Sequence, residues 1–101
     1  MTKQDGKLNP IHPGEILKEE FMVPFGLSAN QLALRLQVPT GRITSIVNGQ
    51  RAITPETALR LSAFFETTAE FWLNLQQLYE LQLAKQTSGD KIRQEVRPLA
   101  G

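Results

Sequence analysis

The stretch LALRLQVPTGRITSIVNGQR, residues 32–51, holds two short apolar runs separated by a turn of only a few residues. Each run has the spacing of a helix with one buried face; the apolar positions are Leu32, Ala33 and Leu36, then Ile43, Ile46 and Val47. A helix that ends after Gln37, turns through Val38 and Pro39 and then restarts is a helix-turn-helix. In this arrangement Ala33 must be small, because the second helix crosses close to it.

The second helix is expected to present small polar positions on its outer face, at Thr40, Gly41, Arg42, Thr44, Ser45 and Asn48. Hydroxyl and amide groups together with an arginine suit base edges and phosphates in a DNA major groove. Gly41 has no side chain, so the backbone could approach DNA closely there. A small residue, an apolar turn and two isoleucines also occur in ordinary helical hairpins, so a purely structural hairpin is the alternative.

The net charge of the 101-residue chain is only +1, but its charges are segregated. No acidic residue lies between Glu20 and Glu56, whereas Arg35, Arg42 and Arg51 fall inside this window. A positive segment flanked by acidic ones can turn one face toward a phosphate backbone. Taken alone, chance clustering of three arginines would explain the same pattern.

Capping signals divide the rest of the chain into helices. Pro13 and Glu15 suit the first turn of a helix that ends near Pro24. Three further starts carry a hydroxyl cap, at Ser28 with Gln31, at Thr54 before Pro55 and Glu56, and at Thr67-Thr68-Ala69-Glu70. The last start opens the longest candidate helix, Ala69 to about Gln86. Few segments alternate with a period of two, so the sequence predicts an all-α fold of five helices without strands.

The last predicted helix carries more apolar surface than one small domain needs. Its broad apolar face covers the core, yet Leu73 and Leu81 lie off that face. Such a surplus on a terminal helix predicts a twofold-symmetric homodimer. Two recognition helices about 34 Å apart would then read successive major grooves. The residues expected at the dimer interface are Phe71, Trp72, Leu73, Leu78 and Leu81.

The composition argues against catalysis and against a metal or cofactor site. The chain has no cysteine, and its one histidine, His12, is expected to cap a helix rather than to bind a metal. Glu19 and Glu20 point about 100° apart on a helix, so they cannot share an acid–base site. No apolar run approaches the roughly 20 residues of a membrane span, and no signal-peptide pattern is present. A cytoplasmic, non-enzymatic protein without a cofactor is therefore expected.

Two groups of motifs carry a family resemblance. The run from His12-Pro13-Gly14-Glu15 through Gln31-Leu32-Ala33 to Val47-Asn48-Gly49 resembles the lambda-repressor-like, XRE-type helix-turn-helix family. The stretch ITPETALRLSAFFETTAEFWLNLQQLYEL, residues 53–81, is similar to the HigA antitoxins of bacterial toxin–antitoxin modules. HPGE combined with EFWLNLQ is far more distinctive than the helix-turn-helix alone. The resemblance covers about residues 11–84.

This resemblance implies a five-helix lambda-repressor-like domain that dimerises and binds double-stranded operator DNA before its own operon. It also implies a protein partner, a HigB-like ribonuclease toxin that the chain would neutralise. By position, the implied phosphate and DNA-backbone contacts are Gln31, Asn48, Gln50 and Arg51, and the residues facing the major groove are Thr40, Arg42, Thr44 and Ser45. The chain departs from the family pattern at Gln37, where many relatives have glycine, and at Pro39, where a hydroxyl residue often caps the next helix.

The expected organisation has three parts. Residues 1–11 form a flexible segment, residues 12–86 form the helix-turn-helix domain with its dimerisation helix, and residues 87–101 form a disordered tail. The main hypothesis is an autoregulating antitoxin. An XRE-type repressor with no toxin partner and a module that mainly binds a toxin, with weak DNA binding, are the alternatives.

Overall fold

The computed structural model describes residues 9–100, which form five helical segments and no strand. The first segment is continuous from α1, Pro13–Ile16, into a π-helical stretch η1, Leu17–Met22; then come α2, Ala29–Leu36, α3, Thr40–Val47, α4, Pro55–Phe65, and α5, Ala69–Glu95. The expected all-α fold of five helices is therefore confirmed. Of the predicted flexible segment, residues 1–8 lie outside the described range, and residues 9–11 have no regular secondary structure.

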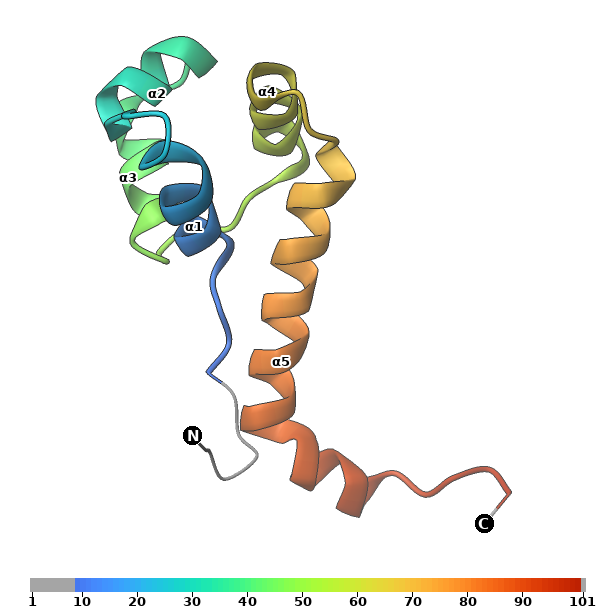
Figure 1. Ribbon diagram of the computed structural model, residues 1–101. Helices are drawn as coiled ribbons and strands as arrows, with labels where there is room; N and C mark the ends of the chain where they lie inside the picture. Colours follow the sequence, from blue (N-terminus) through green and yellow to red (C-terminus); the bar gives the residue numbers. More distant parts are fainter. Residues whose placement is uncertain (1–8, 101) are drawn as a thin grey trace.

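The five segments pack around a single core (Figure 1). α2 packs on α3, α4 packs on α5, and α1 contacts both α3 and α5, so the N-terminal helix joins the two pairs. The largest fully buried hydrophobic side chains are Leu17, Leu32, Ile43, Ile46, Ile53, Leu61 and Trp72. Across residues 9–100, none of the helices is both long and apolar enough to pass through a bilayer.

Ser28 and Gln31 form the reciprocal capping box that the sequence predicts at the start of α2. The Gln31 backbone N–H donates to Ser28 Oγ at 3.1 Å, and the Ser28 backbone N–H donates to Gln31 Oε1 at 2.9 Å. The start of α4 is also as predicted, because Thr54 Oγ1 accepts the backbone N–H of Thr57. Both helix starts depend on groups only three residues apart, which is why local sequence identifies them.

The start of α5 corrects the predicted capping box. Thr68, and not Thr67, is the N-cap, and its Oγ1 accepts the backbone N–H of Phe71 at 3.0 Å. Thr67 Oγ1 instead accepts the indole N–H of Trp72 at 2.8 Å. A buried indole needs a hydrogen-bond acceptor. The adjacent threonines therefore have two different tasks, one for the helix end and one for the core.

The turn between α2 and α3 uses a left-handed residue that is not glycine. Gln37 has φ 59° and ψ 48°, a conformation that an L side chain adopts at a cost of roughly 1–2 kcal/mol. The backbone N–H of Val38 returns to the carbonyl of Ala33 at 3.0 Å, which closes the turn. Pro39 precedes α3 without a side-chain cap. The two departures from the family pattern thus leave the helix-turn-helix intact.

The end of α5 also differs from the expectation. The helix continues to Glu95, whereas the sequence predicts an end near Gln86 and a disordered tail from residue 87. Residues 87–95 are helical and carry two ion pairs at helical spacing, Lys91 with Glu95 and Asp90 with Arg93. Figure 1 shows these last turns projecting away from the core and changing direction. In this part of the helix the hydroxyl of Thr87 donates back to the carbonyl of Leu83, a type of bond that often accompanies helix bending.

Candidate nucleic-acid interface

The second helix of the motif, α3, packs with its buried face against apolar side chains of the core and against α1. Ile43 and Ile46 are both 0% exposed, as predicted, and Val38 packs against the same core. Gly14 of α1 lies directly against the C-terminal part of α3; a Cβ built on it would be 1.8 Å from the carbonyl oxygen of Ile46. The angle of α3 is therefore fixed by its own isoleucines and by a backbone-to-backbone contact.

The opposite side of α3 is largely exposed, although Thr40 and Arg42 at its edges bond to neighbouring helices. Gly41, Thr44 and Asn48 are exposed, and Thr40 and Ser45 are half-buried. Thr44 Oγ1 donates to the carbonyl of Thr40 at 3.1 Å, so its hydroxyl proton is used within the helix. The methyl group and the oxygen lone pairs of Thr44 remain available to a ligand. A Cβ added at Gly41 would meet nothing within 4 Å. This face could therefore enter a groove without any rearrangement of the core.

The N-terminal ends of α2 and α3 are joined by a side-chain hydrogen bond that the sequence did not indicate. Thr40 Oγ1 donates to Asn30 Oδ1 at 2.9 Å. The side-chain carbonyl oxygens of Asn30 and Gln31 both accept hydrogen bonds within the protein. The side-chain NH₂ groups of the two residues therefore remain as donors at this edge. Amide donors of this kind suit phosphate oxygens. Asn30 thus joins Gln31 as a candidate contact, although only Gln31 was predicted.

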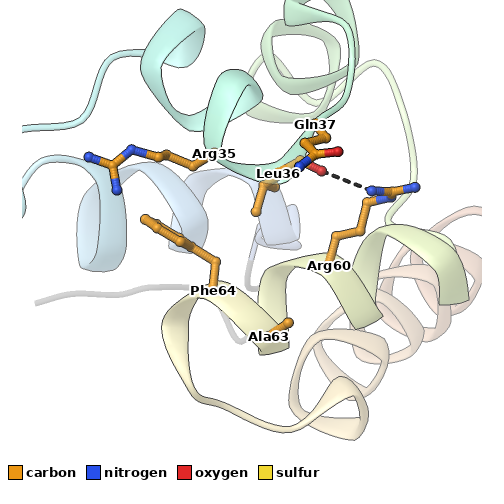
Figure 2. A pocket seen from close by; sticks show the side chains of 6 residues that line it. All are labelled: Arg35, Leu36, Gln37, Arg60, Ala63 and Phe64. Carbon is orange, nitrogen blue, oxygen red and sulfur yellow. Dashed lines mark hydrogen bonds between the residues drawn. The ribbon is translucent and has the colours of Figure 1, made fainter.

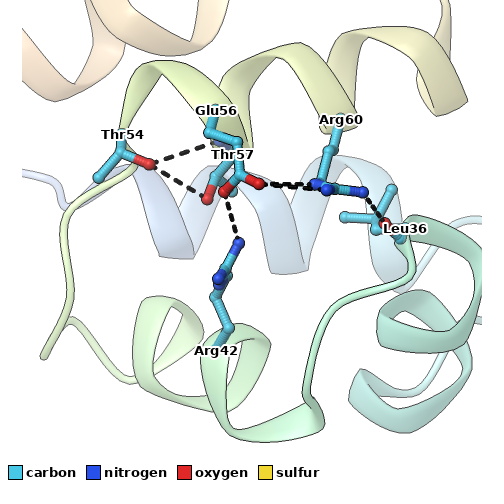
Figure 3. Close-up of polar contacts among 6 residues, drawn as sticks. All are labelled: Leu36, Arg42, Thr54, Glu56, Thr57 and Arg60. Carbon is cyan, nitrogen blue, oxygen red and sulfur yellow. Dashed lines mark hydrogen bonds and ion pairs between the residues drawn. The ribbon is translucent and has the colours of Figure 1, made fainter.

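The sequence predicts that the Arg42 side chain is free to enter a groove, but in the structure it forms an ion pair. Its Nη1 donates to Glu56 Oε1 at 2.8 Å, and its side chain is 25% exposed (Figure 3). Glu56 Oε2 accepts from Arg60 on the next turn of α4, at 3.1 Å. The guanidinium of Arg60, and after it that of Arg42, holds the pKa of Glu56 below its usual range. Part of the predicted positive window is therefore balanced by Glu56.

The other two arginines of the acid-free window lie in different surroundings. The Arg35 guanidinium is 5.9 Å from the ring centroid of Phe64, next to a pocket that lies between the end of α2 and α4 (Figure 2). Arg51 follows α3, is exposed, and has no ion pair among residues 9–100. Asn48 and Gln50, predicted with Arg51 to meet the DNA backbone, are exposed in the same turn.

His12 contacts the turn after α3 and is also the N-cap of α1, the capping role that the sequence predicts. Its Nδ1 accepts the backbone N–H of Gly14 at 2.9 Å. Its ring lies edge-on to Tyr79 of α5, with 4.9 Å between centroids. Burial lowers the pKa of His12, and a weaker opposite effect comes from a hydrogen bond with the backbone of Arg51. One neutral ring thus links α1, the turn after α3 and α5.

The state of His12 predicts that the protein loses stability on mild acidification. Folding lowers the pKa of this ring below its unfolded value of about 6.5, so the neutral ring belongs to the folded state. The stability that neutral His12 contributes is fully present above pH ~6.5 and is lost as the pH falls from there through the folded-state pKa. Urea unfolding at pH 7.5 and pH 5 should show this decrease.

His12→Asn is the matched control for this prediction, because asparagine can accept the same backbone N–H but does not titrate. The variant should lose most of the dependence between pH 7.5 and pH 5, since His12 is the only histidine in the chain. An equal dependence in both proteins would place the titrating group elsewhere.

The residues predicted at the dimer interface divide into exposed and buried ones. Phe71, Leu78 and Leu81 are 37%, 51% and 50% exposed on α5, which leaves them available to a partner. Leu73 is partly buried against the core of its own chain. Trp72 is 0% exposed and is corrected to a core residue, because its ring and its indole N–H are both satisfied internally.

Gln76, which the sequence does not indicate as a structural residue, is buried on the inner side of α5. Its Oε1 accepts the backbone N–H of Ile53 at 2.9 Å, and its Nε2 donates to Glu80 at 2.9 Å. Gln76 therefore anchors the segment between α3 and α4 to α5. No local signal identifies it, since a polar residue within an apolar helix face appears in sequence as a solvent-facing position.

Comparison with known proteins places this geometry in a family. A helix-turn-helix family model matches residues 17–72. The chain is 57% identical to a solved addiction module antidote protein of the HigA family from Coxiella burnetii, with a TM-score of 0.86 over 90% of this chain and 99% of that chain. It is 44% identical to Pseudomonas aeruginosa antitoxin HigA, solved with the higBA promoter, with a TM-score of 0.87 over 89% and 98%. Virulence-associated protein I of Dichelobacter nodosus is 54% identical over 76 residues, 75% of this chain and 70% of that protein.

Proposed function

Because the chain belongs to the helix-turn-helix family, within the branch of the HigA antitoxins, we propose that it binds operator DNA as a homodimer and represses its own operon. In the same proposal it neutralises a HigB-like ribonuclease toxin in the cytoplasm. The family is a non-enzymatic one, so membership agrees with the expectation that the chain is not an enzyme.

The outer face of α3 is the observation that carries the proposal. Its inner side is fixed by Ile43, Ile46 and Gly14, and Gly41, Thr44 and Asn48 are exposed on its outer side. A rigid helix with small polar residues outward is what a major groove accepts. The relative from Pseudomonas aeruginosa, with nearly the same fold, was solved with the higBA promoter, which supports promoter binding by this chain.

The homodimer follows from the remaining apolar surface of α5. Phe71, Leu78 and Leu81 lie outside the core, and Leu78 also lines an apolar groove with Ile11 and Ile16. A second copy placed on this surface would bury it and set two α3 helices on one duplex. One recognition helix buries little DNA surface, so pairing supplies both affinity and the preference for a palindromic site.

The DNA-binding part is tested with a duplex from the promoter of the chain's own operon and a scrambled duplex of equal length. Thr44→Ala with Ser45→Ala should weaken promoter binding by about 1–3 kcal/mol while leaving scrambled-duplex binding unchanged. Arg51→Ala should weaken both and reduce the log–log salt slope by about 0.9, as expected for one phosphate contact. Fluorescence anisotropy over a salt series measures both effects.

Arg97→Ala is the matched charge control, because Arg97 is exposed beyond the end of α5 and far along the chain from α3. It should leave the salt slope unchanged. Promoter binding that survives the change at Thr44 and Ser45 would remove α3 as the reading helix. A salt response that is flat in the unmodified protein would favour the alternative of a mainly toxin-binding module.

The toxin part is tested by identifying any small protein encoded next to the chain and co-expressing the two. Growth arrest by that protein alone, relieved by the chain and accompanied by co-purification, is the expected result. Promoter repression without any neighbouring toxin would instead support the alternative of an XRE-type repressor.

A further inference from the structure

Glu56 joins two arginines that come from different helices (Figure 3). Its Oε1 accepts from Arg42 Nη1 of α3 at 2.8 Å, and its Oε2 accepts from Arg60 Nε and Nη2 of α4 at 3.2 and 3.1 Å. Each carboxylate oxygen thus has its own cationic partner. A contact between residues 42 and 56 connects α3 to α4 directly, through the half-buried side chain of Arg42.

Arg60 is in turn fixed by the end of α2. Its Nη1 donates to the backbone carbonyl of Leu36 at 2.9 Å, as Figures 2 and 3 both show. Leu36 is the last residue of α2, where carbonyl groups lack helical partners. The carboxylate of Glu56 is therefore held by a guanidinium that is itself bonded to the backbone. It presents Arg42 with an acceptor in a fixed position.

The fixed acceptor gives the guanidinium of Arg42 a defined orientation. Arginine has five N–H donors in a planar fork, and only Nη1 has a partner among residues 9–100. The side chain is 25% exposed, so part of it remains accessible to solvent. A guanidinium with one edge fixed can offer the other edge to a single base or phosphate, whereas a mobile one adds positive charge without direction.

Resting on the proposed function, we propose that Glu56 is a specificity-determining positioning residue, which acts on DNA through Arg42. A carboxylate beside a DNA-binding helix repels every phosphate backbone and so lowers general affinity. In exchange, the orientation of Arg42 favours the operator over other sequences. Discrimination of this kind depends on a difference in affinities and not on affinity itself.

The experiment compares Glu56→Gln with the unmodified dimer on the promoter duplex and on the scrambled duplex of equal length. Glutamine has nearly the same shape but has one acceptor oxygen in place of two and no charge, so it cannot hold both arginines. Scrambled-duplex affinity should rise, promoter affinity should fall, and their ratio should drop about tenfold. Circular dichroism and thermal unfolding establish that the variant is folded.

Two controls separate positioning from a general loss of charge. Glu70→Gln removes a carboxylate from the second helical position of α5, as Glu56→Gln does in α4, and Glu70 has no ion pair among residues 9–100. It should leave the ratio unchanged. In an Arg42→Ala background Glu56→Gln should no longer lower the ratio, because its effect passes through Arg42.

The outcomes are distinguishable. Parallel strengthening on both duplexes, with a constant ratio, would overturn the inference and leave only a field effect of Glu56. A lower ratio that persists in the Arg42→Ala background would also overturn it. Absence of any promoter preference in the unmodified protein would overturn the proposed function, and the inference with it.

Discussion

Gly14→Ala is expected to lower the free energy of unfolding by about 3 kcal/mol, at the upper end for overpacking of a core. The new Cβ would be 1.8 Å from the carbonyl oxygen and 2.6 Å from the carbonyl carbon of Ile46. Both atoms belong to the backbone of α3, so no flexible side chain can move aside. Either α1 separates from α3, or the last turn of α3 is distorted.

Gly41→Ala is the matched control for this prediction. It is the same substitution in the adjacent helix α3, but the new Cβ meets nothing within 4 Å. Stability should remain unchanged or rise by up to about 1 kcal/mol, because alanine is the better helix former. Urea unfolding of the two variants measures the difference. Equal stabilities would mean that α1 and α3 are not in close contact.

Leu78→Glu combined with Leu81→Glu is expected to convert the proposed dimer to a monomer and to reduce operator affinity by at least ~100-fold, or about 2.8 kcal/mol. Both leucines are about half exposed on α5 and lie apart from Trp72, which faces the core. Two carboxylates in an apolar interface would have to be buried without partners or to remain apart. With one recognition helix per particle, the second half-site is lost.

Sedimentation equilibrium and anisotropy on the same samples test this prediction. Leu34→Glu with Leu59→Glu is the matched control for dimerisation, since these leucines are 70% and 62% exposed on α2 and α4. The control should remain dimeric. A fully dimeric Leu78 and Leu81 variant would place the interface elsewhere, and a monomer that retains operator affinity would remove the need for a dimer in DNA binding.

The elements that sequence predicted well are those defined by neighbours along the chain. The capping box of Ser28 and Gln31 and the N-cap of Thr54 involve groups three residues apart, so their signals are local. Ile43 and Ile46 were identified as core residues because a period of 3.6 places them on one face of α3. The helix-turn-helix and its outward face therefore followed from residues 32–51 alone.

The parts that sequence could not predict depend on contacts between distant residues. The bond between Arg42 and Glu56 spans fourteen positions, and nothing local to Arg42 indicates it. Gly14 was noted only as part of a motif, because the need for a missing side chain arises from the approach of α3. Trp72 was assigned to the interface because an apolar periodicity does not distinguish a partner from the chain's own core.

The end of α5 shows a different limit. The sequence predicts a tail from residue 87 because this stretch combines Gly89, Asp90 and Pro98 with little helical periodicity. In the structure, pairs such as Lys91 with Glu95 support further turns of the helix. Propensity is a weak guide where charges at helical spacing can compensate for a single glycine.

The contact between Gly14 and the carbonyl of Ile46 has a consequence for how such proteins diversify. The supports of α3 are backbone atoms and buried isoleucines, none of which overlaps with Thr44, Ser45 or Asn48. Substitutions at those three exposed or half-exposed sites can therefore accumulate without tilting the helix. In the course of evolution such a chain can come to prefer a new promoter by changes at these surface positions alone, while the residues that support α3 stay the same.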